Sequence, residues 1–358
     1  MPKVALSIIS NLYIGAQMNI RNANNILIIQ TAFIGDVILT TPLIRETKRA
    51  FPEAHIDVLV IPETKNVLNN NPHIRSILVF DKRSKKIRTF FKMVWMIYKS
   101  KYDFAFAAHR SMTTAWLMIL GGTKIRIGFT GKAAARLMSD PITFRQSARQ
   151  VERYLDLLRP MTYRPLEAQS ELFFSPEIEQ RSRHLLSVLD PQKPKIIIAP
   201  GSVRATKRWP EERFTELLKK LGRIDINIIL MGSPGEKILC DKIERDSSVN
   251  GVLNLAGKTS LLEAAAVIKK SDLLVCNDSG TMHMANAVST DVFAFFGPTV
   301  EWFGFSPFRP NDKVFQVDVD CRPCGTHGGK ACPKGHFKCM LDIEVEQVYQ
   351  AIVKKLDM

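Results

Sequence analysis

Short apolar runs alternate with amphipathic stretches along most of the chain. From residue 25 onward the runs are four or five residues long and continuous, which is typical of strands buried on both faces of a sheet. The stretches between them repeat apolar positions at helical spacing. The first half therefore predicts parallel strands at 26–29, 56–60, 77–80, 104–107 and 125–129, with helices that include 37–50, 87–99 and 150–158.

A second series of the same kind follows a connector marked by Pro160, Pro165 and Pro176. Its predicted strands are 196–199, 226–231, 252–255, 273–276 and 292–296, and its helices are 211–221, 236–245, 261–269, 281–287 and 345–356. We therefore expect an α/β protein with two Rossmann-like, doubly wound domains that face each other. The expected parts are an N-terminal tail (1–24), an N-terminal domain (25–168), a C-terminal domain (169–342) and a C-terminal helix (343–358).

The basic charge is concentrated in the first half of the chain. The formal net charge of the 358 residues is +15; residues 1–170 hold 25 Lys and Arg against 11 Asp and Glu, and residues 171–358 hold 25 against 24. Such a domain attracts polyanions or an anionic membrane surface. A generally basic, solvated surface is the simpler interpretation. A non-catalytic nucleic-acid-binding protein is a remote alternative, because the chain contains no recognisable nucleic-acid-binding module.

Apolar segments and cysteines indicate the compartment. No apolar run reaches the roughly 20 residues that span a bilayer, and residues 4–16 are interrupted by polar positions. We therefore expect neither a transmembrane span nor a secretory signal. Two of the six cysteines, Cys240 and Cys276, fall in a predicted buried helix and strand, which suits a reducing cytoplasm.

Open α/β sheets bind ligands at the carboxyl ends of their strands, so the loops after strands are where we expect chemistry. The first such loop, 30–37, contains Gly35, which lets the backbone turn into the next helix, and Asp36 in the first turn of that helix. Asp36 either caps the helix or acts as a general base. The chain contains neither GxGxxG nor GxxxxGK[ST], which argues against a dinucleotide-redox site and a P-loop.

The second loop, 200–212, places Ser202, Thr206 and Lys207 just before a helix start. Hydroxyls, a cation and free backbone N–H groups in this position suit a phosphate or pyrophosphate. A solvated basic loop is the structural alternative.

The third loop, 277–285, starts another helix. Ser279 and Gly280 leave backbone N–H groups free at its N-terminus, Asp278 can accept hydrogen bonds from sugar hydroxyls, and His283 follows one turn later as either a ligand contact or a structural residue. Two anion sites in one half indicate a nucleotide diphosphate.

Three separate strings, in order along about residues 25–350, resemble the ADP-heptose:lipopolysaccharide heptosyltransferases. They are QTAFIGDV at 30–37, APGS at 199–202 with TKRWP at 206–210, and NDSGTMH at 277–283 with FGPT at 296–299. The chain is most similar to the heptosyltransferase II branch, since HRS at 109–111 and the cysteine-rich segment 321–340 resemble that branch.

The resemblance implies a GT-B glycosyltransferase of family 9 that inverts configuration and needs no metal or other cofactor. Asp36 would be the base, and Lys207, helped by Ser202, would neutralise the ADP leaving group. The other implied contacts of the donor are Thr206, Glu236, Thr259, Asp278, Ser279, Gly280 and His283, and those of the acceptor are His109, Arg110 and Arg136.

The implied reaction moves a heptose from ADP-L-glycero-D-manno-heptose to the inner-core heptose of lipopolysaccharide. The partners would be ADP-heptose and a lipid A-Kdo-heptose acceptor at the cytoplasmic face of the inner membrane, with no nucleic acid. A heptosyltransferase I, which uses a Kdo acceptor, or another member of the family is the alternative.

The segment 321–339 also offers thiolates for a tetrahedral zinc ion, through Cys321, Cys324, Cys332 and Cys339. Their spacing matches no common zinc finger. We expect a reduced or partly disulfide-bonded surface loop instead of structural zinc.

Overall fold

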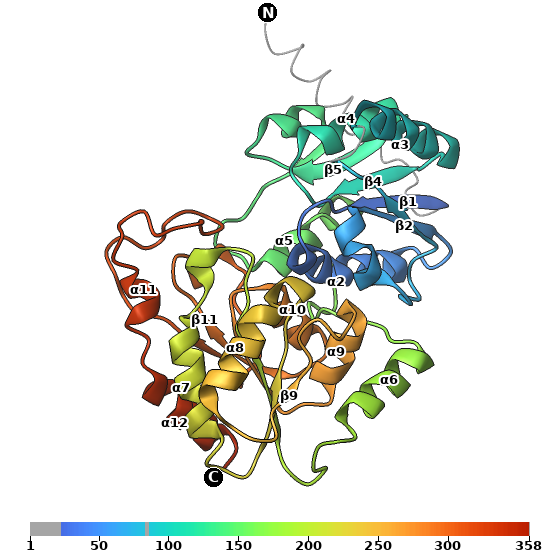
Figure 1. The fold of residues 1–358 in the computed structure, drawn as a ribbon. Helices are drawn as coiled ribbons and strands as arrows, with labels where there is room; N and C mark the ends of the chain where they lie inside the picture. The colour runs from blue at the N-terminus through green and yellow to red at the C-terminus, as the bar shows by residue number, and fades with distance from the viewer. Residues whose placement is uncertain (1–22, 83–85, 358) are drawn as a thin grey trace, which may run out of the picture.

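Two six-stranded parallel sheets form the framework of the computed structural model, which describes residues 23–82 and 86–357 (Figure 1). Residues 1–22 of the predicted tail lie outside the described residues. The first sheet has the order β3-β2-β1-β4-β5-β6. Its strands are β1 (Asn25–Ile29), β2 (His55–Val60), β3 (Ser76–Val79), β4 (Phe104–Ala107), β5 (Ile125–Phe129) and β6 (Asp140–Ile142).

The second sheet repeats this arrangement in the order β12-β11-β10-β7-β8-β9. Its strands are β7 (Lys195–Ala199), β8 (Asn227–Leu230), β9 (Leu253–Asn254), β10 (Leu273–Asn277), β11 (Asp291–Phe295) and β12 (Lys313–Phe315). In each sheet the chain starts in the middle, proceeds to one edge, and then crosses to build the other side, which is the doubly wound Rossmann order. The predicted pair of Rossmann-like sheets is confirmed.

Helices cover both faces of each sheet. In the first half they are α2 (Ile34–Ala50), α3 (Lys86–Ser100), α4 (Met112–Leu120) and α5 (Gln150–Asp156); in the second half they are α6 (Pro176–Leu186), α7 (Glu211–Leu221), α8 (Lys237–Ser247), α9 (Leu261–Lys269), α10 (Gly280–Ala287), α11 (Lys338–Leu341) and α12 (Val345–Lys355). In Figure 1, α3 and α4 lie on the face of the first sheet that is turned away from the second half, whereas α2 lies toward it and packs against α10.

Three α-helices among the described residues were not predicted from the sequence: α4, α6 and α11, the last of only four residues. Helix α6 lies in the expected connector: Ser175 caps it through a hydrogen bond from the Ile178 N–H, but only Ser182 and Leu186 are buried, so its apolar periodicity is weak. Helix α4 is apolar on nearly all sides, so it lacks the amphipathic pattern that marks a helix.

The connector between the sheets is anchored to α2 by buried charges. Nη1 of Arg45 is 2.6 Å from a carboxylate oxygen of Glu171, and Glu46 accepts hydrogen bonds from the Tyr163 hydroxyl and the Leu166 N–H, both at 3.0 Å. The Glu46 side chain is fully buried, so these donors stabilise a charge that water cannot reach. The predicted domain boundary at 168/169 lies within this anchored segment and stays a prediction.

Candidate active site between the two sheets

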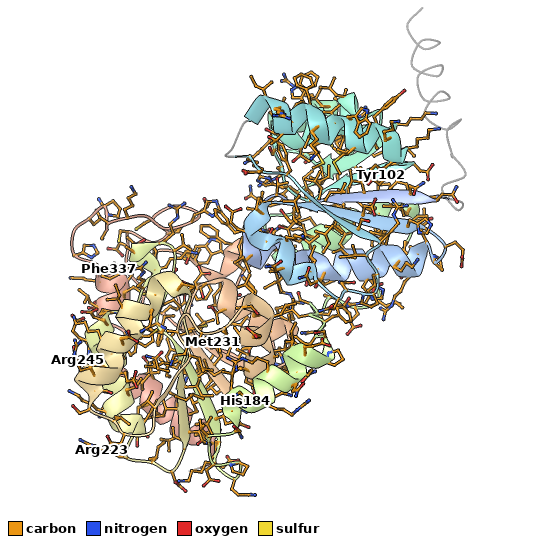
Figure 2. The ribbon with its side chains drawn as sticks, turned by 45° about the vertical axis from the view of Figure 1, so that its right-hand side comes forward. Tyr102, His184, Arg223, Met231, Arg245 and Phe337 are labelled. Carbon is orange, nitrogen blue, oxygen red and sulfur yellow. The ribbon has the colours of Figure 1, made fainter. Side chains whose placement is uncertain are left out.

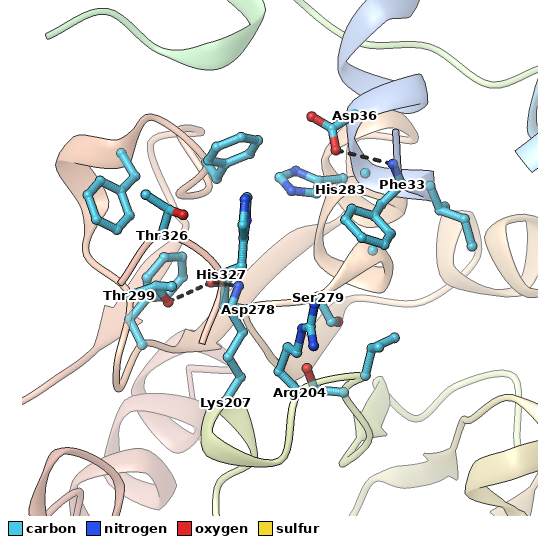
Figure 3. Close-up of a pocket in the computed structure, with 18 of the residues that line it drawn as sticks. Phe33, Asp36, Arg204, Lys207, Asp278, Ser279, His283, Thr299, Thr326 and His327 are labelled. Atoms are coloured by element: carbon cyan, nitrogen blue, oxygen red, sulfur yellow. Dashed lines mark hydrogen bonds and ion pairs between the residues drawn. The ribbon is translucent and has the colours of Figure 1, made fainter. Parts of the chain in front are cut away.

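The carboxyl ends of the central strands of both sheets open onto one cavity of about 390 Å³, within the usual size range for a small-molecule site (Figure 3). The first half contributes residues that follow β1 and β2, and the second half contributes residues that follow β7, β10 and β11. Of the predicted site residues, those that line the cavity are Asp36, Ser202, Lys207, Asp278, Ser279, Gly280 and His283. Residues almost 250 positions apart therefore share one binding space.

Asp36 is held on the first wall by its position in the first turn of α2. One carboxylate oxygen accepts a hydrogen bond from the Phe33 N–H at 3.4 Å, and the other accepts one from the Tyr154 hydroxyl at 2.9 Å. Burial raises the pKa of Asp36 above its ordinary value, while the Tyr154 and Phe33 donors act against that rise. A carboxylate with a raised pKa is a stronger base, and this one faces the cavity.

The N-termini of α2 and α10 approach each other closely at this point. A Cβ atom on Gly35 would lie 2.5 Å from Cδ2 of His283, so only glycine fits there. Burial lowers the pKa of His283 to about 4, so its imidazole is neutral near pH 7. His283 can therefore exchange hydrogen bonds with a ligand without adding positive charge.

The second wall carries an ion pair. Nζ of Lys207 is 2.5 Å from Oδ2 of Asp278, and the Thr299 hydroxyl donates to the same oxygen at 2.6 Å (Figure 3). Both charged side chains are largely buried. An ammonium group has three N–H donors, so Lys207 can bind Asp278 and still donate to an anion in the cavity.

Asn277 joins the two loops that form this wall. Its side-chain oxygen accepts a hydrogen bond from the Trp209 N–H at 2.8 Å, and its side-chain nitrogen donates to the carbonyls of Pro200 at 2.8 Å and Gly201 at 3.2 Å. The side chain is completely buried. It fixes the loop after β7 against the loop after β10, which brings Lys207 to Asp278.

Ser279 has an unsatisfied hydroxyl beside this ion pair. Its Oγ atom is buried and has no hydrogen-bond partner among the described residues, although the residue lines the cavity at the N-cap of α10. Buried hydroxyls are nearly always hydrogen-bonded in proteins. This atom and the free N–H groups of the helix start therefore indicate a place for a polar, anionic ligand group.

Three predicted donor contacts lie outside the cavity lining. The Thr206 hydroxyl accepts a hydrogen bond from the Gly329 N–H at 2.7 Å, so it holds the cysteine-rich loop. Glu236 accepts from the Ser233 N–H and hydroxyl, both at 2.8 Å, and its carboxylate lies against Gly201. Thr259 lies between β9 and α9. Glu236 and Thr259 thus follow β8 and β9 along the sheet edge that also holds Lys207.

The predicted acceptor contacts separate into two groups. His109 and Arg110 follow β4, next to the strand that leads to Asp36; Nδ1 of His109 is 3.0 Å from the Thr31 hydroxyl, and the Arg110 guanidinium stacks 3.6 Å from the centre of the Phe144 ring. Burial, with positive charge nearby, lowers the pKa of His109 to about 4. Arg136 is exposed on a 3-10 helix, Ala133–Leu137, and none of these three residues lines the cavity.

Comparison with known proteins gives this site a context. The sequence profile of glycosyltransferase family 9 (heptosyltransferase) matches residues 91–333. The chain belongs to glycosyltransferase family 9. It is 28% identical over 282 residues to lipopolysaccharide heptosyltransferase 3 of Escherichia coli (75% of this chain, 82% of the relative) and 27% identical over 350 residues to lipopolysaccharide heptosyltransferase 2 of E. coli K12 (91% and 97%).

Solved structures confirm the expected fold. The structure of E. coli ADP-heptose lps heptosyltransferase II superposes with a TM-score of 0.74 at 24% identity, covering 93% of this chain and 98% of that one. The chain is thus a family 9 glycosyltransferase with the GT-B fold, as the sequence predicted.

Several residues that line the cavity of this family 9 enzyme were not predicted from the sequence. Thr326 and His327 come from the cysteine-rich segment, and Phe303 and Phe305 come from the stretch after β11. These segments have no regular periodicity, and only folding brings them to the cavity. Tyr154, which donates to Asp36, was missed as well, although the helix that carries it was predicted at 150–158.

The cysteine-rich loop of the enzyme contains no disulfide in the structure: all six cysteines are free. Sγ of Cys321 is 3.7 Å from Nε2 of His336, and the Cys324 thiol donates to the Cys321 carbonyl at 3.0 Å. Within residues 23–82 and 86–357, no three histidine, cysteine or acidic side chains are grouped so as to hold a metal ion. The metal state and redox state of this loop stay predictions.

Proposed function

We propose that this enzyme transfers a heptose from ADP-heptose to a heptose of the lipopolysaccharide inner core, with inversion at the anomeric carbon. The observation that carries the proposal is that one cavity has Asp36 on one wall and Lys207 beside a helix N-terminus on the other. A base and an anion site on opposite sides of a sugar-sized space suit a direct displacement.

In this reaction Asp36 takes the proton from the acceptor hydroxyl while the oxygen of that hydroxyl attacks the anomeric carbon. The bond between this carbon and the diphosphate oxygen breaks, and ADP leaves with the electron pair. The raised pKa of Asp36 makes its carboxylate a better proton acceptor. The Tyr154 hydrogen bond fixes the direction in which the carboxylate points.

The negative charge that develops on the diphosphate would be stabilised by Lys207 and by the free N–H groups at the start of α10. Preorganised donors of this kind contribute strongly to catalysis because they need no rearrangement as the charge forms. Asp278 would then serve two roles, since it holds the Lys207 ammonium and offers acceptors to heptose hydroxyls. The unsatisfied Ser279 hydroxyl would donate to a phosphate oxygen.

The rest of the donor would extend along the edge of the second sheet. From β7 the neighbouring strands are β8 and then β9, which lead to Glu236 and Thr259. This order suits a nucleotide whose diphosphate lies near Lys207, whose ribose lies near Glu236 and whose adenine lies near Thr259.

The acceptor would enter from the first half, where His109 and Arg110 lie near the strand end that leads to Asp36. The enzyme would work as a peripheral protein at the cytoplasmic face of the inner membrane. The relatives include heptosyltransferases 2 and 3, so the acceptor is the part of the proposal that needs the most direct test.

The test measures ADP release from ADP-heptose with three purified acceptors, which end in Kdo, in the first heptose or in the second heptose. We expect turnover on the acceptor that ends in the first heptose, and loss of this turnover in Asp36→Asn. Turnover on the Kdo-ended acceptor alone would assign heptosyltransferase I activity, and turnover on the last acceptor alone would assign addition of a third heptose. If none of the three acceptors supports ADP release, the proposal is refuted.

A further inference from the structure

Helix α3 exposes a stripe of large apolar side chains. Ile87, Phe91, Trp95 and Tyr98 are 75%, 59%, 60% and 64% exposed. Successive residues are about 100° apart around a helix, so these four positions lie on one face. A different face of α3, with Met93 and Ile97, is buried against the sheet. The exposed stripe is therefore a second apolar face, which the fold of the described residues does not cover.

Helix α4 carries a shorter stripe of the same kind. Met112, Trp116 and Leu120 are spaced four residues apart and are between 42% and 47% exposed. The two helices pack together, and residues of both, such as Ile97 and Leu117, belong to one buried cluster. They lie on the side of the first sheet turned away from the second half, and the side chains of the helices at the top of Figure 2 project outward. We call the exposed residues of both stripes the α3–α4 face.

The sequence around α3 and α4 is strongly basic. Between residues 82 and 139 the sequence has 13 Lys and Arg and a single acidic residue, Asp103. This carboxylate accepts hydrogen bonds from the Asn24 and Asn25 N–H groups at 2.7 and 2.9 Å. On α3, Arg88, Lys92 and Lys99 are exposed beside the apolar stripe, and the Lys99 ammonium lies 5.2 Å from the centre of the Trp95 ring. Most of the excess charge of the first half thus falls in this stretch of the sequence.

We propose that the α3–α4 face docks on the surface of an anionic phospholipid bilayer, with its apolar side chains in the interface and its basic side chains at the headgroups. Aromatic residues favour the level of the headgroups, and Lys and Arg are attracted by the negative potential of the surface. A helix with an apolar face and a basic flank lies in the plane of such an interface. Among the described residues, no helix is long and apolar enough to cross a bilayer.

Charge decides between a bilayer and a second copy of the chain as the occupant. A symmetric dimer through this face would place Arg88, Lys92 and Lys99 opposite the same cations of the other copy, which is unfavourable. Since α3 and α4 contain no Asp or Glu, the face offers no partner to these cations. An anionic lipid surface neutralises them and covers the apolar stripe at the same time.

The position of the face also relates to the cavity. Helix α4 begins at Met112, directly after His109 and Arg110, and both α3 and α4 start at the carboxyl edge of the sheet, where Asp36 lies. The start of α4 is thus the end of the face nearest the cavity. Docking there would bring the membrane surface close to the predicted acceptor residues. Only the statement that docking brings the membrane close to the acceptor residues rests on the proposed function. Binding of the α3–α4 face to a bilayer does not depend on the reaction.

The test is sedimentation of the full chain with vesicles made of equal parts phosphatidylglycerol and phosphatidylcholine, compared with vesicles of phosphatidylcholine alone. We expect binding to the anionic vesicles, weakened by salt, and at least a tenfold lower partition coefficient for the double variant Phe91→Ser/Trp95→Ser. The matched control is Val188→Ser/Ile238→Ser, which removes two apolar side chains of the second half that are even more exposed, at 75% and 83%, and should bind like the wild type.

Two outcomes would overturn the proposal: no binding of the wild type to anionic vesicles, or equal binding of the α3–α4 variant and the control. A wild-type dimer in analytical ultracentrifugation that the α3–α4 variant abolishes, without vesicle binding, would assign the face to a second copy instead. Melting temperatures of both variants show whether they are folded. Vesicle binding needs neither donor nor acceptor, and heptose transfer to a short, lipid-free acceptor needs no vesicle. The proposed docking and the proposed transfer reaction can therefore fail independently of each other.

Discussion

Replacement of Tyr154 by phenylalanine tests the role of Asp36 through the pH dependence of the reaction. The Tyr154 hydroxyl donates to the Asp36 carboxylate at 2.9 Å and therefore stabilises its charged form. Asp36 must be deprotonated to act as a base, so activity falls as the pH drops below its raised pKa. Loss of this hydrogen bond raises that pKa further, and the acidic limb of the pH–rate profile moves to higher pH.

The size of the effect follows from the strength of the bond. A hydrogen bond to a charged group contributes about 1.5–3 kcal/mol. Asp36 keeps the Phe33 N–H as a second donor, so we take the lower end of this range, about 1.5 kcal/mol. A loss of this size raises the pKa of Asp36 by about one unit and lowers kcat/KM about tenfold at a fixed pH on the acidic limb. The plateau at high pH should change little, because the carboxylate is then fully deprotonated. Tyr154 is only 2% exposed, and phenylalanine fills the same space without its hydroxyl.

The assay is kcat/KM for ADP release between pH 4 and pH 9 with saturating acceptor. Tyr163→Phe is the matched control, because it removes a hydroxyl that donates to Glu46 at 3.0 Å, outside the cavity lining. Asp36→Asn should lower the plateau itself by about 10²- to 10⁴-fold. An unchanged acidic limb in Tyr154→Phe, or the same shift in Tyr163→Phe, would refute the assignment of this limb to Asp36.

Three further predictions concern other parts of the structure. Lys207→Met should lower kcat by about 10²-fold or more, because a preorganised charge is lost; a change in KM alone would assign Lys207 to donor binding only. Gly35→Ala forces a Cβ atom within 2.5 Å of the His283 imidazole and should lower the free energy of unfolding, measured by denaturant titration, by about 1–3 kcal/mol. The control Gly235→Ala, whose Cβ atom would meet no atom nearer than 3.9 Å, should leave this free energy unchanged. Under iodoacetamide, mass spectra should show that Cys332 is alkylated first, since backbone N–H groups lower its pKa. Buried Cys276, whose pKa burial raises, should stay unmodified, and alkylation of Cys276 before Cys332 would contradict this prediction.

The sequence was sufficient to predict both sheets and three of the loops that meet at the cavity. Continuous apolar runs predicted the central strands to within one residue at most ends, because strands buried on both faces are mostly apolar. The loops after β1, β7 and β10 were identified because ligand sites of open α/β sheets lie at the carboxyl ends of strands. Asp36, Lys207 and Asp278 follow directly from that rule.

Elements without a strong local pattern were not predicted. Helix α6 buries two of its residues, and the three-residue strands β6 and β12 are too short to show a period. The predicted acceptor contacts His109, Arg110 and Arg136 all lie outside the cavity lining, and their roles stay predictions.

The sequence by itself determined which residues follow which strand, because the periodicity that marks a strand or a helix depends only on residues close together in the chain. Only the tertiary structure decided which of those residues meet. Three features join segments more than a hundred residues apart: the contact of Gly35 with His283, the hydrogen bond from Tyr154 to Asp36, and the place of His327 in the same cavity as Asp36. Their physical cause is the packing of the two sheets with their helices, and no periodicity along the chain encodes it.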